Sequence, residues 1–442
     1  MHIALVAISG VRSANKDLME AGLTLPGFVE RSKVIASLPS LALLTLAGMT
    51  PDPFDISYHE VPDIGALAEL PSCDVAAISS YSAQIKDAYA LADRFRAAGV
   101  IVVLGGLHVT ALPDEALAHA DAVVTGEGEI GWPEVLRDLP TGRLRQVYAA
   151  GGREFDLADA PMPRFDLLEI ERYNRLTVQT QRGCPWRCEF CASSIALTPR
   201  YKVKPVQRVL AEVREIKRLW PHPFIEFADD KSFADRHRSK ELLRGLAPER
   251  VHWFSECDIS IADDQELLDL MRESGCRELL IGLESPTAAG IDGVERRRNW
   301  KRTRFDHYAE DIARIQARGI AVNGCFVLGL DGDGPEVFDA IDAFVRESGQ
   351  FDVQITVATP FPGTPLYERL RQEGRLLEEG AWERCSLFDV NFEPRNMTAA
   401  QLQDGLMGLA RRLYTEEERD ARRDRFWEQR RRERRHLAGA LA

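Results

Sequence analysis

The stretch 182–191 reads RGCPWRCEFC and places three of the chain's eight cysteines, Cys184, Cys188 and Cys191, within eight residues. Structural zinc usually takes four nitrogen or sulfur ligands, commonly as two separated pairs. Structural [4Fe–4S] clusters normally take four cysteines. A group of three thiolates therefore leaves one coordination position open. This spacing predicts a reactive metal site at which a small molecule binds the open position.

The composition around this stretch is that of a globular protein with several structural units. Of the 442 residues, 45% are hydrophobic and 28% are charged, which is enough for a large buried core. No apolar run reaches the roughly 20 residues of a membrane span, and the first residues predict a buried strand, not a secretion signal. We therefore expect a cytoplasmic protein with reduced thiols. The net charge of −13 argues against nucleic acid as the main partner.

From residue 176 onward, short apolar runs alternate with helical patterns. The runs that predict strands are TVQTQRG (177–183), FIEFADD (224–230), VHWFSEC (251–257), ELLIGLES (278–285), AVNGCFVLGL (321–330) and DVQITVATP (352–360). Six such β/α units over 176–374 predict a whole or partial barrel of the TIM type, with its chemistry at the carboxyl ends of the strands. The cysteines follow the first strand, and acidic residues end the next three. Because a lone acid is costly to bury, we expect these side chains to share one site.

Residues 1–150 show the same alternation and predict a doubly wound, Rossmann-like parallel sheet covered on both faces. The expected strands are HIALVAI (2–8), DISYHEV (55–61), DVAAISS (74–80), VIVVLGG (100–106) and DAVVTGEG (121–128). Such sheets bind ligands at the carboxyl ends of their strands, where Ser79, Ser80, Gly105 and Gly106 stand. The glycines are equally compatible with tight turns that bind nothing. The chain lacks a GxGxxG fingerprint, so a nicotinamide cofactor is not expected.

Two segments complete the expected organisation. Residues 151–175 contain prolines and no clear period, which is typical of a linker. Residues 375–442 have a mostly helical pattern, and 411–436 hold eleven arginines and seven acidic residues, a net charge of +4. A solvated amphipathic helix explains this stretch, and a docking surface for an acidic electron donor is the alternative.

The cysteine stretch resembles the signature of the radical SAM superfamily. In both, three and then two residues separate the cysteines, an aromatic residue (here Phe190) precedes the last one, and a barrel's first strand comes just before. The resemblance implies a [4Fe–4S] cluster on Cys184, Cys188 and Cys191 whose open iron binds S-adenosylmethionine. It also implies that an electron from a flavodoxin- or ferredoxin-type donor leads to a 5′-deoxyadenosyl radical. An inert zinc or iron–sulfur site is the alternative.

The resemblance covers nearly the whole chain. One large subgroup of the superfamily carries a cobalamin-binding domain before the barrel. The tail segment 387–402 is similar to the C-terminal region of the subgroup's hopanoid-methylase-like members. The stretches similar to motifs of this subgroup are TGEGE (125–129), FADD (227–230), IGLES (281–285), FVLGLDG (326–332), TPFPGTPLYE (359–368) and LFDVNFEPRNMTAAQL (387–402). The subgroup acts on many compounds, so the resemblance leaves the substrate open between a small molecule and a lipid.

Several residues match cofactor-binding positions of the family. For S-adenosylmethionine, the resemblance implies Glu284 and Ser285 near the ribose or methionine part and Phe190 at the adenine. It places Asp229 or Asp230, together with Glu256, in the same pocket. For cobalamin, it implies that the turns at Ser79, Ser80, Gly105 and Gly106 hold the corrin and its nucleotide tail. It assigns no residue to the substrate.

One departure from the family pattern leaves cobalamin use open. The motif D-x-H-x-x-G supplies a histidine to cobalt after the first strand, but residues 9–30 contain no histidine. Many members lack the motif and still use cobalamin, although its absence also permits a domain that has lost the cofactor. The favoured function is cobalamin-dependent methylation of an unactivated carbon. The alternatives are a cobalamin-independent radical alkyl transfer, cyclisation or rearrangement, and a sensor without turnover.

Overall fold

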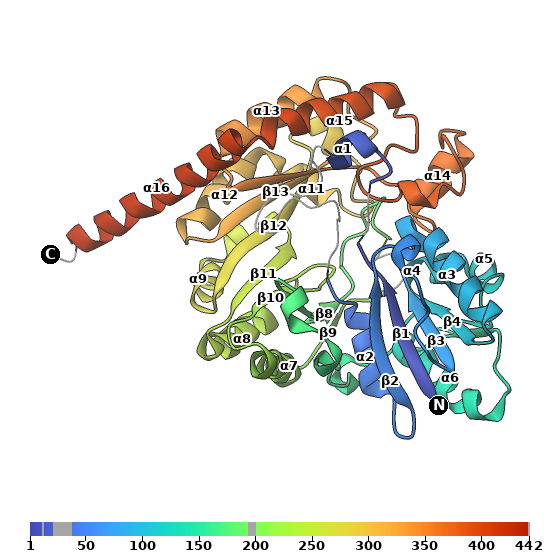
Figure 1. Ribbon diagram of the computed structural model, residues 1–442. Coiled ribbons are helices and arrows are strands. Elements are labelled where there is room, and N and C mark those ends of the chain that lie inside the picture. The colour runs from blue at the N-terminus through green and yellow to red at the C-terminus, as the bar shows by residue number, and fades with distance from the viewer. Residues whose placement is uncertain (11–12, 21–37, 193–199, 441–442) are drawn as a thin grey trace.

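Two parallel sheets organise the chain in the computed structural model, which describes residues 1–10, 13–20, 38–192 and 200–440 (Figure 1). The strand order is β2–β1–β3–β4–β5–β6 in the first sheet and β14–β13–β12–β11–β10–β7 in the second. All neighbouring strands in both sheets are parallel. The predicted fold class, a doubly wound sheet followed by a partial barrel, is confirmed.

The first sheet contains the five predicted strands and one more. Its strands are β1 (His2–Ile8), β2 (Asp55–Val61), β3 (Val75–Ser79), β4 (Ile101–Gly105), β5 (Ala122–Thr125) and β6 (Val147–Ala149). The accompanying helices are α1 (Lys16–Glu20), α2 (Leu41–Met49), α3 (Ile85–Ala97), α4 (Leu107–Ala111), α5 (Pro113–Leu117) and α6 (Gly128–Asp138). The sequence did not reveal β6 because only Tyr148 of this edge strand is buried.

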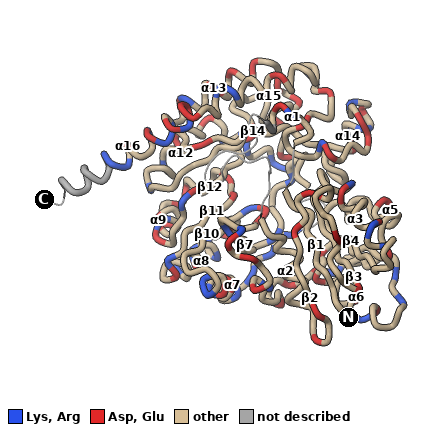
Figure 2. The backbone as a smooth tube through the Cα atoms, in the orientation of Figure 1, with Lys and Arg blue, Asp and Glu red and all other residues tan. Residues whose placement is uncertain are grey.

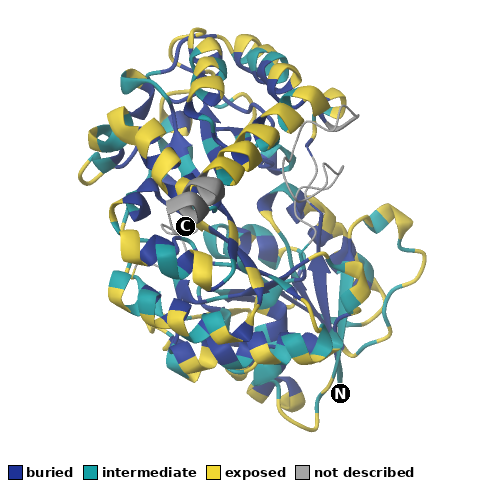
Figure 3. Cartoon of the chain, turned by 90° about the vertical axis from the view of Figure 1, so that its left-hand side faces the viewer, coloured by how far each residue is buried: buried dark blue, intermediate teal, exposed yellow. Residues whose placement is uncertain are grey.

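The residues of β1 alternate between two hydrophobic clusters, one on each face of the first sheet. Ile3, Leu5 and Ala7 belong to one cluster, whereas Ala4, Val6 and Ile8 belong to the other. A central parallel strand that is covered on both faces needs apolar side chains in both directions. This requirement explains the nearly continuous apolar run that predicted the strand. Figure 3 shows these strands as buried layers beneath helices with exposed outer faces.

The second sheet carries the barrel. Its strands are β7 (Leu176–Val178), β10 (Phe224–Phe227), β11 (His252–Cys257), β12 (Cys276–Glu284), β13 (Ala321–Leu328) and β14 (Asp352–Val357). Its helices are α7 (Val206–Leu219), α8 (Arg236–Leu246), α9 (Gln265–Glu273), α10 (Ala288–Ile291), α11 (Trp300–Arg304), α12 (Tyr308–Ala317) and α13 (Val337–Ser348). A large hydrophobic cluster fills the space between these helices and strands.

The first predicted barrel strand is interrupted after three residues. Thr180 N and Gln181 N donate to Asp229 Oδ1 at 2.7 and 3.0 Å, so they are withdrawn from the sheet. The chain continues as β8 (Gln181–Arg182), which pairs antiparallel with β9 (Lys202–Val203). The prediction of one strand over 177–183 was therefore too long, and the break lies directly before the cysteine loop.

The C-terminal part of the chain packs against both sheets. It contains α14 (Pro365–Gln372), α15 (Ala399–Leu413) and α16 (Glu416–Ala440). Trp382 lies in a hydrophobic cluster of the first sheet, and its Nε1 donates to Glu115 Oε2 at 3.1 Å. Asp389 accepts hydrogen bonds from the backbone N of Ala14 and of Asn15, both at 2.8 Å. Figure 1 shows α14 next to the helices of the first sheet.

The N-terminal part of the long helix α16 is bound to the barrel, and the helix then extends away from the rest of the chain (Figure 1). Arg422 Nη2 and Arg423 Nη2 contact the two carboxylate oxygens of Asp352 at 3.3 and 3.1 Å. Among residues 416–432 only Arg422 and Phe426 are buried. The predicted helix is confirmed, although it is polar nearly all round instead of amphipathic, and Figure 2 shows basic residues along it. No helix in the described part of the chain has the length and apolar character to cross a membrane.

Candidate functional site

The cysteine loop follows β8 at the carboxyl end of the barrel's first strand. Cys184, Cys188 and Cys191 are all half-buried, and none of the three forms a disulfide. Cys191 N donates to Cys188 O at 3.1 Å, which folds the end of the loop into a tight turn. Burial raises the pKa of Cys184 to about 11 and that of Cys188 to about 12. These thiols therefore stay protonated at neutral pH until a metal ion displaces the protons.

The donor set fits an iron–sulfur cluster better than a single ion. Within residues 1–10, 13–20, 38–192 and 200–440, no three ligating side chains converge on the position of one metal ion. In a cubane cluster, each cysteine binds a different iron atom, so the thiols need not converge. Three cysteines without a fourth match a cluster with one open iron.

Aromatic and charged side chains fix the loop from one side. The Trp186 ring stacks on Trp300 with centroids 4.8 Å apart, and Trp186 Nε1 donates to Asp258 Oδ2 at 3.0 Å. Lys231 pairs with the same carboxylate and lies 4.9 Å from the centre of the Trp186 ring. Together these contacts place a buried cation next to the cysteine loop.

A second buried lysine lies beside the loop and pairs with Glu284. The Lys301 ammonium group forms an ion pair with Glu284 and donates to Gly282 O at 3.0 Å. Burial opposes this charge, but the Glu284 carboxylate outweighs burial and raises the pKa of Lys301. A Cβ on Gly282 would lie 2.6 Å from Glu284 Oε1, so only glycine leaves room for the pair.

The backbone at Glu284 takes a conformation that is rare for a residue with a side chain. Its φ is +64°, and the register between β12 and β13 shifts between Gly282 and Glu284. Bulges of this kind re-aim a side chain near functional sites. Sequence reasoning found Glu284 from its motif but missed Lys301, whose neighbours in the sequence are mostly charged and form no recognisable pattern.

The other predicted residues at this end of the barrel have different environments. Asp229 is buried and also accepts a hydrogen bond from Ser232 Oγ at 3.0 Å, so it is committed to the turn before the loop. Glu256 is exposed, although the surrounding protein, together with the carboxylates of Glu226 and Asp230, raises its pKa to about 7. Asp230 lines the cavity described below. Their role in binding S-adenosylmethionine stays a prediction.

Phe190 and Ser285 are the remaining residues predicted to contact S-adenosylmethionine. Phe190 is partly buried against the hydrophobic cluster of the barrel. Ser285 Oγ lies 3.5 Å from Asp333 Oδ1 and 3.1 Å from Thr287 Oγ1. Burial raises the pKa of Asp333 to about 7. The assignments of Phe190 to the adenine and of Ser285 to the ribose or methionine part also stay predictions.

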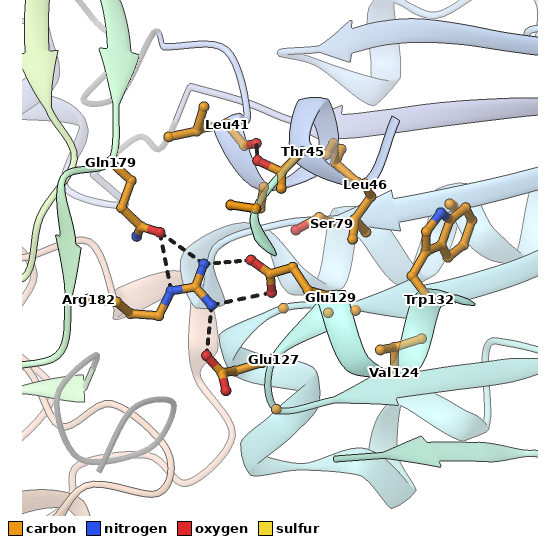
Figure 4. Close-up of a pocket in the computed structure, with 18 of the residues that line it drawn as sticks. Leu41, Thr45, Leu46, Ser79, Val124, Glu127, Glu129, Trp132, Gln179 and Arg182 are labelled. Atoms are coloured by element: carbon orange, nitrogen blue, oxygen red, sulfur yellow. Dashed lines mark hydrogen bonds and ion pairs between the residues drawn. The ribbon is translucent and has the colours of Figure 1, made fainter. Parts of the chain in front are cut away.

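A cavity of about 310 Å³ lies at the carboxyl edge of the first sheet and faces the barrel (Figure 4). Its lining is mainly apolar near the sheet and α2, and polar where the barrel meets it. The apolar lining comprises Leu41, Ala42, Leu43, Leu46, Ala77, Ile78, Val103, Leu104, Val124, Trp132, Ala160 and Ala228. The polar lining includes Glu127, Glu129, Gln179, Arg182, Lys204 and Asp230.

Three of the four residues predicted to hold cobalamin, Ser79, Gly105 and Gly106, line this cavity. Ser80 is not part of the lining, and its buried Oγ has no hydrogen-bond partner among the described residues. Gly106 has a φ of +120°, and a Cβ there would lie 3.2 Å from Ser79 Oγ. Backbone without side chains thus opens the cavity, as close approach of a flat ligand requires. The cavity lining contains no histidine, and residues 11–12 and 21–30 of the histidine-free stretch lie outside the described residues.

Three sequence profiles match the chain. The radical SAM superfamily matches residues 178–345, the B12 binding domain matches 33–136, and a domain of unknown function, DUF4070, matches 364–440. Two parallel α/β halves with a cysteine triad at their junction thus define a radical SAM enzyme with a B12 binding domain. The matches support the resemblance to the radical SAM superfamily, in its subgroup with a cobalamin-binding domain. The predicted resemblance is confirmed, and so is the cofactor set of an iron–sulfur cluster, S-adenosylmethionine and cobalamin.

Several relatives are methyltransferases. The chain is 28% identical to bacteriochlorophyllide d C-12(1)-methyltransferase of Chlorobaculum tepidum, over 86% of this chain and 83% of the relative. It is 26% identical to hopanoid C-2 methylase of Rhodopseudomonas palustris, over 78% of this chain and 67% of the relative.

Solved structures share the fold. One is the radical S-adenosylmethionine methyltransferase TsrM from Kitasatospora setae, with cobalamin and a [4Fe–4S] cluster bound. It has a TM-score of 0.62 at 17% sequence identity, and the aligned part covers 84% of this chain and 78% of the TsrM chain. The cobalamin-dependent S-adenosylmethionine radical enzyme OxsB has a TM-score of 0.65 at 14% sequence identity. The aligned part covers 93% of this chain and 66% of the OxsB chain.

Proposed function

We propose that this protein methylates an unactivated carbon of a small molecule or lipid, with cobalamin in the 310 Å³ cavity and the cluster on Cys184, Cys188 and Cys191. One observation carries the proposal. Arg182, two residues before Cys184, is part of the cavity lining. The cavity and the cysteine loop are therefore neighbouring sites at one junction between the two sheets.

The cavity suits the nucleotide tail of cobalamin. Its apolar part lies between α2 and the strands β3, β4 and β5, where a flat aromatic base can be buried. The glycine turn at Gly105 and Gly106 lets the backbone approach the tail closely. The described lining residues include no histidine, so none of them would offer an imidazole to cobalt.

The barrel residues would bind and orient S-adenosylmethionine next to the cluster. When bound, these cofactors supply a carbon-centred radical and a transferable methyl group. Glu284 is held by Lys301 and can accept hydrogen bonds from the hydroxyl or amino groups of the ligand. Phe190 would pack on the adenine. Asp230 and Glu256 would complete the polar wall, and Ser285 would lie beside Glu284.

The proposal extends to organisation, partners and location. We assign residues 1–150 to cobalamin binding, 151–175 to a linker, 176–374 to the radical SAM barrel and 375–442 to a helical region. A flavodoxin- or ferredoxin-type protein would supply the electron. A cytoplasmic location agrees with three half-buried cysteines that form no disulfide, because cytosolic thiols remain reduced.

Anaerobic reconstitution tests the proposed function. The protein is loaded with iron and sulfide, with and without cobalamin, and incubated with a reductant, cell extract and S-adenosylmethionine that carries a deuterated methyl group. We expect about four irons per chain, 5′-deoxyadenosine, and a deuterated product that mass spectrometry detects only when cobalamin is present. Product formed equally without cobalamin would favour the cobalamin-independent alternative. A protein that leaves S-adenosylmethionine intact would contradict the enzyme assignment.

A further inference from the structure

Arg182 lies in the cavity wall, two residues before Cys184, and Figure 4 shows it next to Glu127, Glu129 and Gln179. Its Nη1 donates to Glu127 Oε1 at 2.9 Å, and its Nη2 donates to Glu129 Oε1 at 2.6 Å. Its Nε and Nη2 also contact Gln179 Oε1 at 3.2 and 2.9 Å. We call these four residues, Arg182, Glu127, Glu129 and Gln179, the Arg182 clasp. All four line the cavity.

The clasp connects elements from the two halves of the chain. Glu127 and Glu129 follow β5 of the first sheet, at the start of α6. Arg182 ends β8 of the second half, and Gly183 and Cys184 come directly after it. A displacement of α6 at the cavity wall is therefore transmitted to the backbone that leads into the cysteine loop.

The two carboxylates depend on Arg182 to different degrees. Glu127 has further donors, because Lys202 Nζ lies 2.7 Å and Phe155 N lies 2.9 Å from its Oε2. For Glu129, which is buried, Arg182 is the only charged partner in the described part of the chain. A planar guanidinium can bridge two carboxylates at once, whereas a lysine ammonium cannot do so with the same geometry.

A further residue of the cavity lining, Asp230, binds the next residue of this segment. Gly183 N donates to Asp230 Oδ2 at 2.5 Å, and Asp230 lines the cavity. The segment from Arg182 to Gly183 thus lies between carboxylates from both halves. A ligand that orders the cavity wall also orders the entry to the cysteine loop, and the reverse holds as well.

We infer that Arg182 is a positioning residue that couples cobalamin binding to the cluster site, so that each cofactor binds more tightly when the other is present. The inference rests on the proposed function, because it takes cobalamin as the ligand of the cavity. Coupling between two sites is reciprocal. It is therefore measured from either side as a ratio of two affinities.

Hydroxocobalamin titrations under anaerobic conditions measure this ratio. The first pair of proteins is the cluster-loaded chain and its Cys184→Ala/Cys188→Ala/Cys191→Ala variant without a cluster. The second pair carries Arg182→Gln in addition. We expect the cluster to raise the cobalamin affinity at least about fivefold in the first pair and to leave it unchanged in the second. Arg153→Gln is the matched control, since it removes an arginine that pairs with Glu134 at 2.8 Å outside the cavity lining.

The outcomes separate coupling from a structural role. If Arg182→Gln weakens cobalamin binding equally in both members of the pair, the ratio persists and the inference is overturned. Glu129→Gln keeps the size of the side chain and the bond between Arg182 and Glu127, so it serves as a milder second variant in which the ratio should fall. A ratio that Glu129→Gln leaves unchanged also overturns the inference. An unsubstituted chain that binds no cobalamin at all contradicts the proposed function instead.

Discussion

Exchanging Glu284 for glutamine should weaken the binding of S-adenosylmethionine and also destabilise the protein. A hydrogen bond to a charged group contributes about 1.5–3 kcal/mol, so we expect a dissociation constant roughly ten- to a hundredfold higher. The second effect comes from Lys301, which keeps its bond to Gly282 O at 3.0 Å but loses its counter-charge. Removing one partner of a buried ion pair typically costs about 3–5 kcal/mol of stability.

A second substitution separates these two effects. Lys301→Met in the Glu284→Gln background removes the unpaired ammonium, so the thermal midpoint should recover while the affinity for S-adenosylmethionine stays low. The affinity is measured by anaerobic equilibrium dialysis of cluster-loaded protein, and the midpoint by thermal unfolding without ligand. Asp263→Asn is the control, because it removes only the exposed partner of Arg304, 2.7 Å away, and exposed pairs contribute about 0–1 kcal/mol.

The reasoning fails if Glu284→Gln lowers the thermal midpoint but leaves the dissociation constant unchanged. Glu284 would then serve only to neutralise Lys301, and the residue that contacts S-adenosylmethionine would have to be sought elsewhere in the barrel. Weaker binding that the double variant restores would also refute it, because that result would assign the loss to the unpaired Lys301 and not to Glu284.

Three further predictions concern the metal, a buried acid and the cavity. Cys188→Ala should abolish iron binding, whereas Cys385→Ala should retain about four irons; iron retained after Cys188→Ala would exclude this residue as a ligand. Burial raises the pKa of Glu278 from its usual 4.5 to about 8. Between these pH values the folded state keeps a proton that the unfolded state has lost, so the free energy of unfolding falls as the pH rises. Glu278→Gln should therefore raise the unfolding midpoint at pH 9 more than at pH 5, and equal shifts would contradict this. Gly106→Val should expel cobalamin. Gly142→Val is the control, because Gly142 also has a positive φ but an added Cβ there would meet no atom within 4 Å. This control should show similar backbone strain of about 1–3 kcal/mol and still bind cobalamin.

The sequence predicts most of the fold because the strands are buried on both faces. Ile3 to Ile8 are all apolar. A segment exposed to solvent would not need such a continuous apolar run, so the run predicts a strand buried on both faces. Strand prediction from apolar runs fails where few residues of a strand are buried, or where a side chain accepts the backbone hydrogen bonds that would continue the strand. Strand β6 buries only Tyr148, and Asp229 ends β7 early by accepting two backbone hydrogen bonds from residues far from it in the sequence.

The candidate site is predictable to the extent that it is local. The cysteine spacing is visible in ten residues, and Gly105 and Gly106 point to the edge of the sheet where the cavity lies. The pairing of Lys301 with Glu284 and of Arg182 with Glu129 depends on elements that meet only in the folded chain. No pattern in the sequence distinguishes these cations from the many others in a chain with 56 lysines and arginines.

The contact between Asp389 and the segment after β1 has a consequence for the order of folding. Ala14 and Asn15 donate to a carboxylate that is 375 and 374 positions further along the chain. During synthesis the ribosome releases the first sheet long before residue 389, and domains generally fold as they emerge, from the N-terminus onward. The segment that carries Ala14 and Asn15 can therefore take its final form only after nearly nine tenths of the chain have been made. An incomplete polypeptide could form its first sheet and still leave this segment without the carboxylate that holds it.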